Sequence, residues 1–174
     1  MYLHTRENEK YNLFTPNYRV NGEVLSVFLT YLAAFHYCKA RMESDSKYPV
    51  KDVVVWFSSL HEDMYKNSEN LNKCHYEGAL ELRDYERSLN LITDENQKKY
   101  FLDRVETIRN SWTDIRGVIH NTDFVIEAIG YAKPAATRWF DPIYTMLDLK
   151  AFRQVLELAY ARGATEIIVQ IPDY

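Results

Sequence analysis

The five histidines are the residues of this chain best suited to acid–base or metal chemistry. A neutral imidazole exchanges a proton near neutral pH and is a common zinc ligand. The spacing of these histidines matches neither a His-x3-His pair nor the His-Glu-x-x-His motif of zinc proteases, and the two cysteines do not have zinc-binding spacing. The sequence therefore predicts no metal centre. The histidines are His4, His36, His61, His75 and His120.

Two short patterns around His120 resemble families that cleave phosphoesters. His120-Asn121-Thr122 is similar to one half of the two-histidine phosphoesterase signature, and His4-Thr5 is the candidate for the second half. Arg116 lies four residues before His120, so one face of a helix would present both. This pair resembles the HEPN ribonuclease family, in which an Arg and a His hold and cleave RNA. That family places more residues between the two than the three found here.

The chain has few glycines and many large aromatic residues. It contains 14 Tyr, 8 Phe and 3 Trp but only 5 Gly among 174 residues. Gly-rich loops cradle nucleotide phosphates, and the sequence has neither a P-loop nor a Gly-x-Ser-x-Gly nucleophile elbow. Large aromatic side chains provide rigid contact area and are enriched where proteins bind one another. The composition therefore favours a binding protein without a cofactor.

The net charge indicates which kinds of partner the protein can bind, and the cysteines indicate its cellular compartment. The formal net charge is −4, with basic residues scattered among acidic ones. Nucleic acid is therefore not an expected partner, because a phosphate backbone requires a basic face. Cys38 and Cys74 lie in apolar stretches and are predicted to be buried free thiols. Without a signal-peptide pattern or a membrane-length apolar run, we expect a cytoplasmic protein.

The first third of the chain is predicted to contain an extended segment and one or two helices. Residues 14–20 have an extended pattern and lead into the turn dipeptide Asn21-Gly22. Apolar residues recur at helical spacing over 23–41, which predicts a buried helix. Residues 50–64 contain a Val-rich run typical of a strand, but they also fit a helix with Pro49 in its first turn. We favour the helix there.

The middle of the chain predicts two helices packed as an αα-hairpin. Helical spacing extends over 71–89 and 94–119, with Thr93 or Asp94 as the N-cap of the second helix. The long apolar seam also suits pairing with a second copy of the chain, so a homodimer is an alternative. Five side chains are expected to be buried between the helices: Leu82, Tyr85, Val105, Ile108 and Trp112.

The last third predicts two more helices and a strand. One helix is expected over 122–132, and Asp141-Pro142 begins another that ends before Gly163. Residues 165–171 have the composition of a strand. No repeat or linker divides the chain. The sequence therefore predicts one α+β domain over residues 1–174, predominantly helical, with a small sheet made from the N- and C-terminal segments.

The opening of the chain resembles the NADAR family. Members begin with an acidic-Asn-Glu-Pro-Tyr-Gly stretch, a Ser-Asn-Phe-x-Pro element, an Asp-Gly turn and a helix. The corresponding residues here are Glu-Asn-Glu-Lys-Tyr-Asn-Leu-Phe-Thr-Pro at 7–16, Val-Asn-Gly at 20–22 and the helix from Glu23. Residues 112–116 and 156–173 are similar to later segments of the family.

The NADAR resemblance implies a helix-rich α+β protein that acts on ADP-ribose-type N-glycosidic bonds. By this resemblance, Asn12, Phe14 and Glu23 would bind the nucleotide. Family members carry a catalytic Glu before a Tyr in the first helix, and the matching stretch 26–31 contains none. Asn12 also stands where the family has Gly. The resemblance therefore implies nucleotide binding, and we expect no turnover.

One segment between two predicted helices is rich in the residue types that dominate protein interfaces. Residues 137–144 read Thr-Arg-Trp-Phe-Asp-Pro-Ile-Tyr, and Trp, Tyr and Arg are enriched among binding hot spots. We predict that Arg138, Trp139, Phe140 and Tyr144 contact a protein partner. Alternatively, Trp139 and Phe140 fold back into the core.

Three functions therefore stand as hypotheses. The first is a cytoplasmic protein that binds a protein partner without catalysis, as an inhibitor or accessory factor. The second is a NADAR-like protein that binds ADP-ribose-type nucleotides. The third is a HEPN-like ribonuclease.

Overall fold

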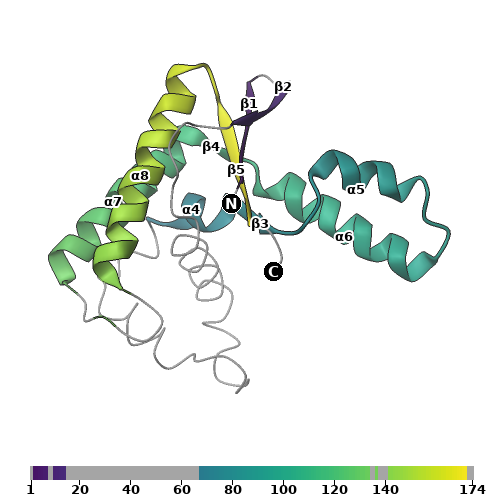
Figure 1. Cartoon of the computed structure of the whole chain (residues 1–174), viewed down its shortest axis with the longest axis horizontal. Helices are drawn as coiled ribbons and strands as arrows, with labels where there is room; N and C mark the ends of the chain where they lie inside the picture. The colour runs from purple at the N-terminus through teal and green to yellow at the C-terminus, as the bar shows by residue number, and fades with distance from the viewer. Residues whose placement is uncertain (1, 8–9, 15–66, 134–135, 137–140, 172–174) are drawn as a thin grey trace.

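The computed structural model describes residues 2–7, 10–14, 67–133, 136 and 141–171 (Figure 1). The predictions for the Asn21-Gly22 turn, the 23–41 helix and the 50–64 element lie outside these residues. The helices of the described part are α4 (Glu69–Lys73), α5 (Leu82–Leu89), α6 (Glu95–Ser111), α7 (Ile115–Ala132) and α8 (Pro142–Ala161). Its strands are β1 (Tyr2–Glu7), β2 (Lys10–Phe14), β3 (His75–Glu77), β4 (Thr113–Asp114) and β5 (Glu166–Ile171).

The five strands form one mixed sheet in which the two ends of the chain meet. The order is β2-β1-β5-β3, and β4 also pairs with β5. Strand β1 is antiparallel to both β2 and β5, whereas β3 is parallel to β5. The predicted α+β class is confirmed, with helices dominant and a small sheet from the terminal segments. The middle of the chain adds β3 and β4.

Strand β5 separates two clusters of buried side chains. Its residues alternate between the two faces of the sheet, as a strand dictates. Ile167, Val169 and Ile171 belong to the larger cluster with α7 and α8, whereas Ile168 belongs to the smaller cluster with α5 and α6. Figure 1 shows the α7–α8 pair on one side of the sheet and the α5–α6 hairpin extending from the other. The almost continuous apolar run of β5 follows from this double burial.

The prediction of one helix over 71–89 is wrong. The chain leaves α4 after Lys73, and His75–Glu77 pairs with β5 before α5 begins at Leu82. Gly78 allows this turn to pack closely, because a Cβ atom at that position would lie 2.7 Å from the Tyr85 hydroxyl oxygen. Pairing with a distant strand therefore overrides the local helical spacing.

The prediction of one helix over 94–119 is wrong for the same reason. Helix α6 ends at Ser111, and Thr113–Asp114 pairs with β5. The Asp114 carboxylate then accepts a hydrogen bond from the Gly117 N–H at 3.0 Å and caps α7. The separate helix expected over 122–132 is the second half of α7.

The αα-hairpin itself is confirmed in a shorter form, as α5 packed against α6. Tyr85, Val105, Ile108 and Trp112 are buried as predicted, and Leu82 packs against them half-buried. The predicted local signals are also correct. The Asp94 carboxylate accepts from Gln97 N–H at 2.9 Å, and Gly163 follows α8 with φ 95°.

The N-terminal cap of α8 provides a direct test of the helix boundary. Asp141 Oδ1 accepts hydrogen bonds from the N–H groups of Ile143 at 2.8 Å and Tyr144 at 3.1 Å. Replacing Asp141 with alanine should therefore lower the free energy of unfolding by about 1 kcal/mol, measured by urea denaturation. Asp141→Asn keeps an acceptor and should retain most of the stability. Equal stability of the alanine variant and the wild type would contradict this role.

Candidate functional sites

One of the four predicted partner-binding residues lies in the described part of the chain. Tyr144 is in the first turn of α8, where its side chain is 62% exposed. Arg138, Trp139 and Phe140 lie outside the described residues. Whether their rings fill the core or face a partner stays a prediction.

Tyr144 has two apolar neighbours on the surface of the same helix. Ile143, Tyr144 and Leu147 are each more than half exposed, and we call these three residues the α8 patch. A hollow of about 470 Å³ lies beside the patch, where the end of α7 meets the start of α8. The hollow is lined mainly by apolar groups: Ile129, Gly130, Lys133, Ala136, Asp141, Pro142, Ile143 and Met146.

The nucleotide-binding residues implied by the NADAR resemblance are described only in part. Asn12 and Phe14 lie in β2, where they pair with Thr5 and Leu3 of β1. Glu23 lies outside the described residues. Strand β1 lies between β2 and β5, so the opening and closing segments that resemble the family belong to one sheet without pairing with each other.

In the phosphoesterase-like pattern His120-Asn121-Thr122, the side chains of Asn121 and Thr122 hydrogen-bond to the backbone of the fold. Asn121 Oδ1 accepts from the N–H groups of Asn70 at 2.8 Å and Leu71 at 3.3 Å, so it caps the start of α4. The Thr122 hydroxyl donates to Val118 O at 2.7 Å. His120 itself is exposed on α7. Only one of the three side chains is therefore presented to solvent.

His4, the candidate for the second half of the phosphoesterase signature, also has a structural role. His4 is buried in β1 and its Nε2 lies 2.9 Å from Gln170 Oε1, while Gln170 Nε2 donates to Gly78 O at 2.9 Å. Burial lowers the pKa of His4, although the bond to Gln170 and the charge of Glu81 raise it in part. This histidine joins β1, β5 and the turn after β3, which is a structural role.

The two residues of the HEPN-like pair lie on one helix, as predicted, and both are exposed. Arg116 and His120 both lie on α7, and Arg116 Nε is 4.0 Å from the Asp114 carboxylate. That carboxylate already caps the helix. An acidic group beside the arginine disfavours a bound phosphodiester at this end of α7.

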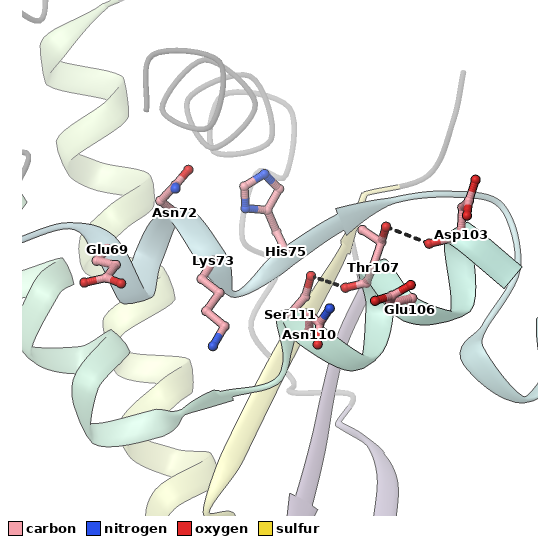
Figure 2. A pocket seen from close by; sticks show the side chains of 9 residues that line it. All are labelled: Glu69, Asn72, Lys73, His75, Asp103, Glu106, Thr107, Asn110 and Ser111. Atoms are coloured by element: carbon pink, nitrogen blue, oxygen red, sulfur yellow. Dashed lines mark hydrogen bonds between the residues drawn. The ribbon is translucent and has the colours of Figure 1, made fainter. Parts of the chain in front are cut away.

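A larger pocket, of about 600 Å³, lies between α4, the start of β3 and the last turns of α6. We call it the α4–α6 pocket (Figure 2). The residues that line it are all of polar or charged types: Glu69, Asn72, Lys73, His75, Asp103, Glu106, Thr107, Asn110 and Ser111. A volume of this size accommodates a small organic ligand.

Two residues that line the α4–α6 pocket each have one buried polar side-chain atom without a hydrogen-bond partner. The two atoms are Nδ1 of His75 and Oδ1 of Asn72, and buried polar atoms of this kind are rare in folded proteins. Burial lowers the pKa of His75 to about 4, although the nearby carbonyl groups of Leu71 and Asn72 raise it in part. His75 is therefore neutral at physiological pH.

Cys74, the cysteine within the described residues, is not a reactive thiol. Cys74 is a buried free thiol, as predicted, and burial raises its pKa to about 12. A thiol with this pKa is not a nucleophile at neutral pH. Cys38 lies outside the described residues.

The α4–α6 pocket was not predicted from the sequence. Its residues come from α4, β3 and α6, and their positions in the sequence match no known motif. The carboxylates Glu69, Asp103 and Glu106 read as ordinary solvated positions on helices, and His75 fell inside a helix prediction that proved wrong. Only the folded chain places these groups around one hollow.

No family model, curated protein or solved structure matches this chain. Among residues 2–7, 10–14, 67–133, 136 and 141–171, no cluster of three His, Cys, Asp or Glu side chains could hold a metal ion. The helices of these ranges include none that combines the length and apolar character needed to span a bilayer.

Proposed function

We propose that this protein acts by binding a protein partner through the α8 patch, as an inhibitor or accessory factor. One observation carries the proposal: three adjacent large apolar side chains, Ile143, Tyr144 and Leu147, are each more than half exposed beside an apolar hollow. Contiguous exposed apolar surface of this kind is typical of a docking site. Tyr144 was singled out from the sequence, and Arg138, Trp139 and Phe140 precede it directly in the chain.

The charged and apolar residues around the α8 patch indicate which groups the partner should carry. The exposed Lys133 lines the same hollow as the apolar residues Ile129, Ile143 and Met146. Among the described residues of the lining, Asp141 is the one carboxylate, and it already accepts two hydrogen bonds from the start of α8. The expected partner therefore inserts an apolar side chain into the hollow and carries acidic groups around it, which pair with Lys133 and Arg138.

Affinity capture from a host lysate tests the proposal when it includes a matched variant. Wild-type protein should retain a stoichiometric partner, and Tyr144→Ala should lose it, with about a thirtyfold increase in Kd for the isolated pair. Tyr160→Ala is the control, because Tyr160 is also an exposed tyrosine on α8, 48% exposed and far along the helix from the patch.

Melting temperatures separate a lost contact from a lost fold. Both tyrosine variants should melt within a few degrees of the wild type, since both rings face solvent. Loss of partner binding in Tyr160→Ala as strongly as in Tyr144→Ala would contradict the assignment of the patch.

A second candidate is binding of ADP-ribose-type nucleotides, as the NADAR resemblance implies. One observation favours it: β1 pairs with both β2 and β5, so the family-like opening and closing segments belong to one sheet, with β1 between them. Asn12, Phe14 and Glu23 are the residues proposed to bind. No turnover is expected, because residues 26–31 lack the Glu that the family carries before its Tyr.

Thermal shift with ADP-ribose and NAD separates the two candidates. A ligand that binds only the folded state raises the melting temperature, so stabilisation by ADP-ribose would support the second candidate. Glu23→Gln should reduce that shift, whereas Tyr144→Ala should leave it unchanged. Full turnover by the wild type on ADP-ribosylated substrates would overturn the expected absence of catalysis.

A further inference from the structure

Five residues form a row along one flank of α6. They are three or four residues apart, which places them on the same face of the helix over a length of about 21 Å. Leu102, at the centre of the row, is 50% exposed, and of the other four only Lys98 is half-buried. We call this row the α6 stripe: Glu95, Lys98, Leu102, Glu106 and Arg109.

The α6 stripe is distinct from the side of α6 that packs inside the chain. Val105, Ile108 and Trp112 are buried in the smaller cluster, so the apolar seam predicted from the sequence is occupied within one molecule. Figure 1 shows the α5–α6 hairpin projecting from the sheet on the side away from α7 and α8. A second molecule that approaches the hairpin therefore does not meet the α7–α8 pair.

The charges of the α6 stripe change sign across Leu102. Lys98 stands four residues before it and Glu106 four residues after it, while Glu95 and Arg109 stand seven residues before and after it. When two copies of α6 pair antiparallel about Leu102, each residue before it faces the residue at the same spacing after it in the other copy. Lys98 then faces Glu106, and Glu95 faces Arg109. A parallel pair would instead set each charge against its own copy, and like charges repel.

The charged groups of the α6 stripe are available for such pairing. Within the part of the chain that the structure describes, Glu95, Lys98 and Glu106 form no ion pair. Arg109 Nη2 donates to Glu86 Oε1 at 2.5 Å, and both side chains are exposed. A guanidinium has five N–H donors, so Arg109 can keep this bond and donate to a second carboxylate.

We propose that this protein forms an antiparallel homodimer through the α6 stripe, with the Leu102 side chains of the two copies in contact on the two-fold axis. Two Lys98–Glu106 pairs and two Glu95–Arg109 pairs surround this contact and fix the direction of pairing. The flank of one helix makes a small interface, so we expect a Kd of about 10–100 μM that rises with salt. The α6 stripe is separate from the α8 patch, so the dimer stands independently of the proposed partner.

Sedimentation velocity of the full chain at increasing concentration and low salt tests the dimer. Glu106→Lys places a lysine opposite Lys98 of the other copy, and Lys98→Glu places a glutamate opposite Glu106. Each variant alone should raise the Kd at least about tenfold. An equimolar mixture of the two variants has opposite charges at both positions, so it should form a heterodimer with a Kd close to that of the wild type.

Glu127→Lys is the control, because it makes the same charge change at an exposed position of α7 outside the α6 stripe. Its Kd should stay within about twofold of the wild type. All of these side chains are on the surface of a helix, so each variant should melt within a few degrees of the wild type.

Three results would overturn the proposal. The first is a wild-type chain that stays monomeric at about 1 mM, well above the expected Kd. The second is a mixture of Lys98→Glu and Glu106→Lys that does not associate although both variants fold. The third is a dimer that survives Glu106→Lys but is lost in Tyr144→Ala, since that result would place the contact on the α8 patch.

Discussion

Replacing Phe152 with alanine should lower the free energy of unfolding by about 3–5 kcal/mol. Phe152 is 1% exposed and lies in the larger buried cluster, where α8 packs against α7 and the sheet. Truncation would remove the transfer free energy of the ring and leave a cavity that rigid neighbours fill only in part. The measurement is equilibrium denaturation in urea, compared at constant m-value.

Gln154→Ala is the matched control for this experiment. Gln154 is exposed on the same helix, two residues along, and alanine is a good helix former. Its substitution should change stability by about 0.5 kcal/mol or less. A loss below about 1 kcal/mol for Phe152→Ala would show that α8 does not pack against the sheet as described.

Acidification should destabilise the protein through His75. In the unfolded chain this histidine has a pKa near 6.5, whereas burial lowers the pKa to about 4 in the folded state. Between these values the unfolded state binds more protons, so stability is fully present above pH 6.5 and falls as the pH decreases toward 4. The contribution lost should reach about 2 kcal/mol at pH 5.

A pair of histidine variants isolates this contribution from the other titrating groups. His75→Gln cannot take up the proton, so its free energy of unfolding should decrease less than that of the wild type between pH 7 and pH 5. His120→Gln, at an exposed position of α7, should follow the wild type. Parallel pH profiles for wild type and His75→Gln would show that the ring is not buried. His4, whose pKa burial also lowers, adds a loss of the same sign in all three proteins.

Part of the α8 patch could be predicted from the sequence. The sequence predicts a partner contact at Tyr144 because the residue type and its place beside a helix start are local properties. It does not predict one at Ile143 or Leu147, since an apolar residue at helical spacing normally faces the core. The helix α8 has apolar residues over more than one face, and only its packing against α7 determines which of them stay exposed.

The α4–α6 pocket was beyond prediction for a different reason. Its acceptors lie on α4, β3 and α6, and each reads singly as a solvated polar residue. Their convergence depends on the break after Lys73, which directs the chain into the sheet. The orphaned atoms of Asn72 and His75 exist only because the folded chain buries them.

Local chemistry determined the ends of the helices and the class of the fold. Asp94, Asp141 and Gly163 mark boundaries that the structure confirms, because a cap depends on hydrogen bonds or backbone angles within one turn of the chain. The spacing of Tyr85, Val105 and Ile108 likewise predicted the α5–α6 packing. Tertiary structure alone decided where the helical runs break. His75–Glu77 and Thr113–Asp114 both pair with β5, about 50 to 95 residues later, and partners at that distance leave no trace in local periodicity.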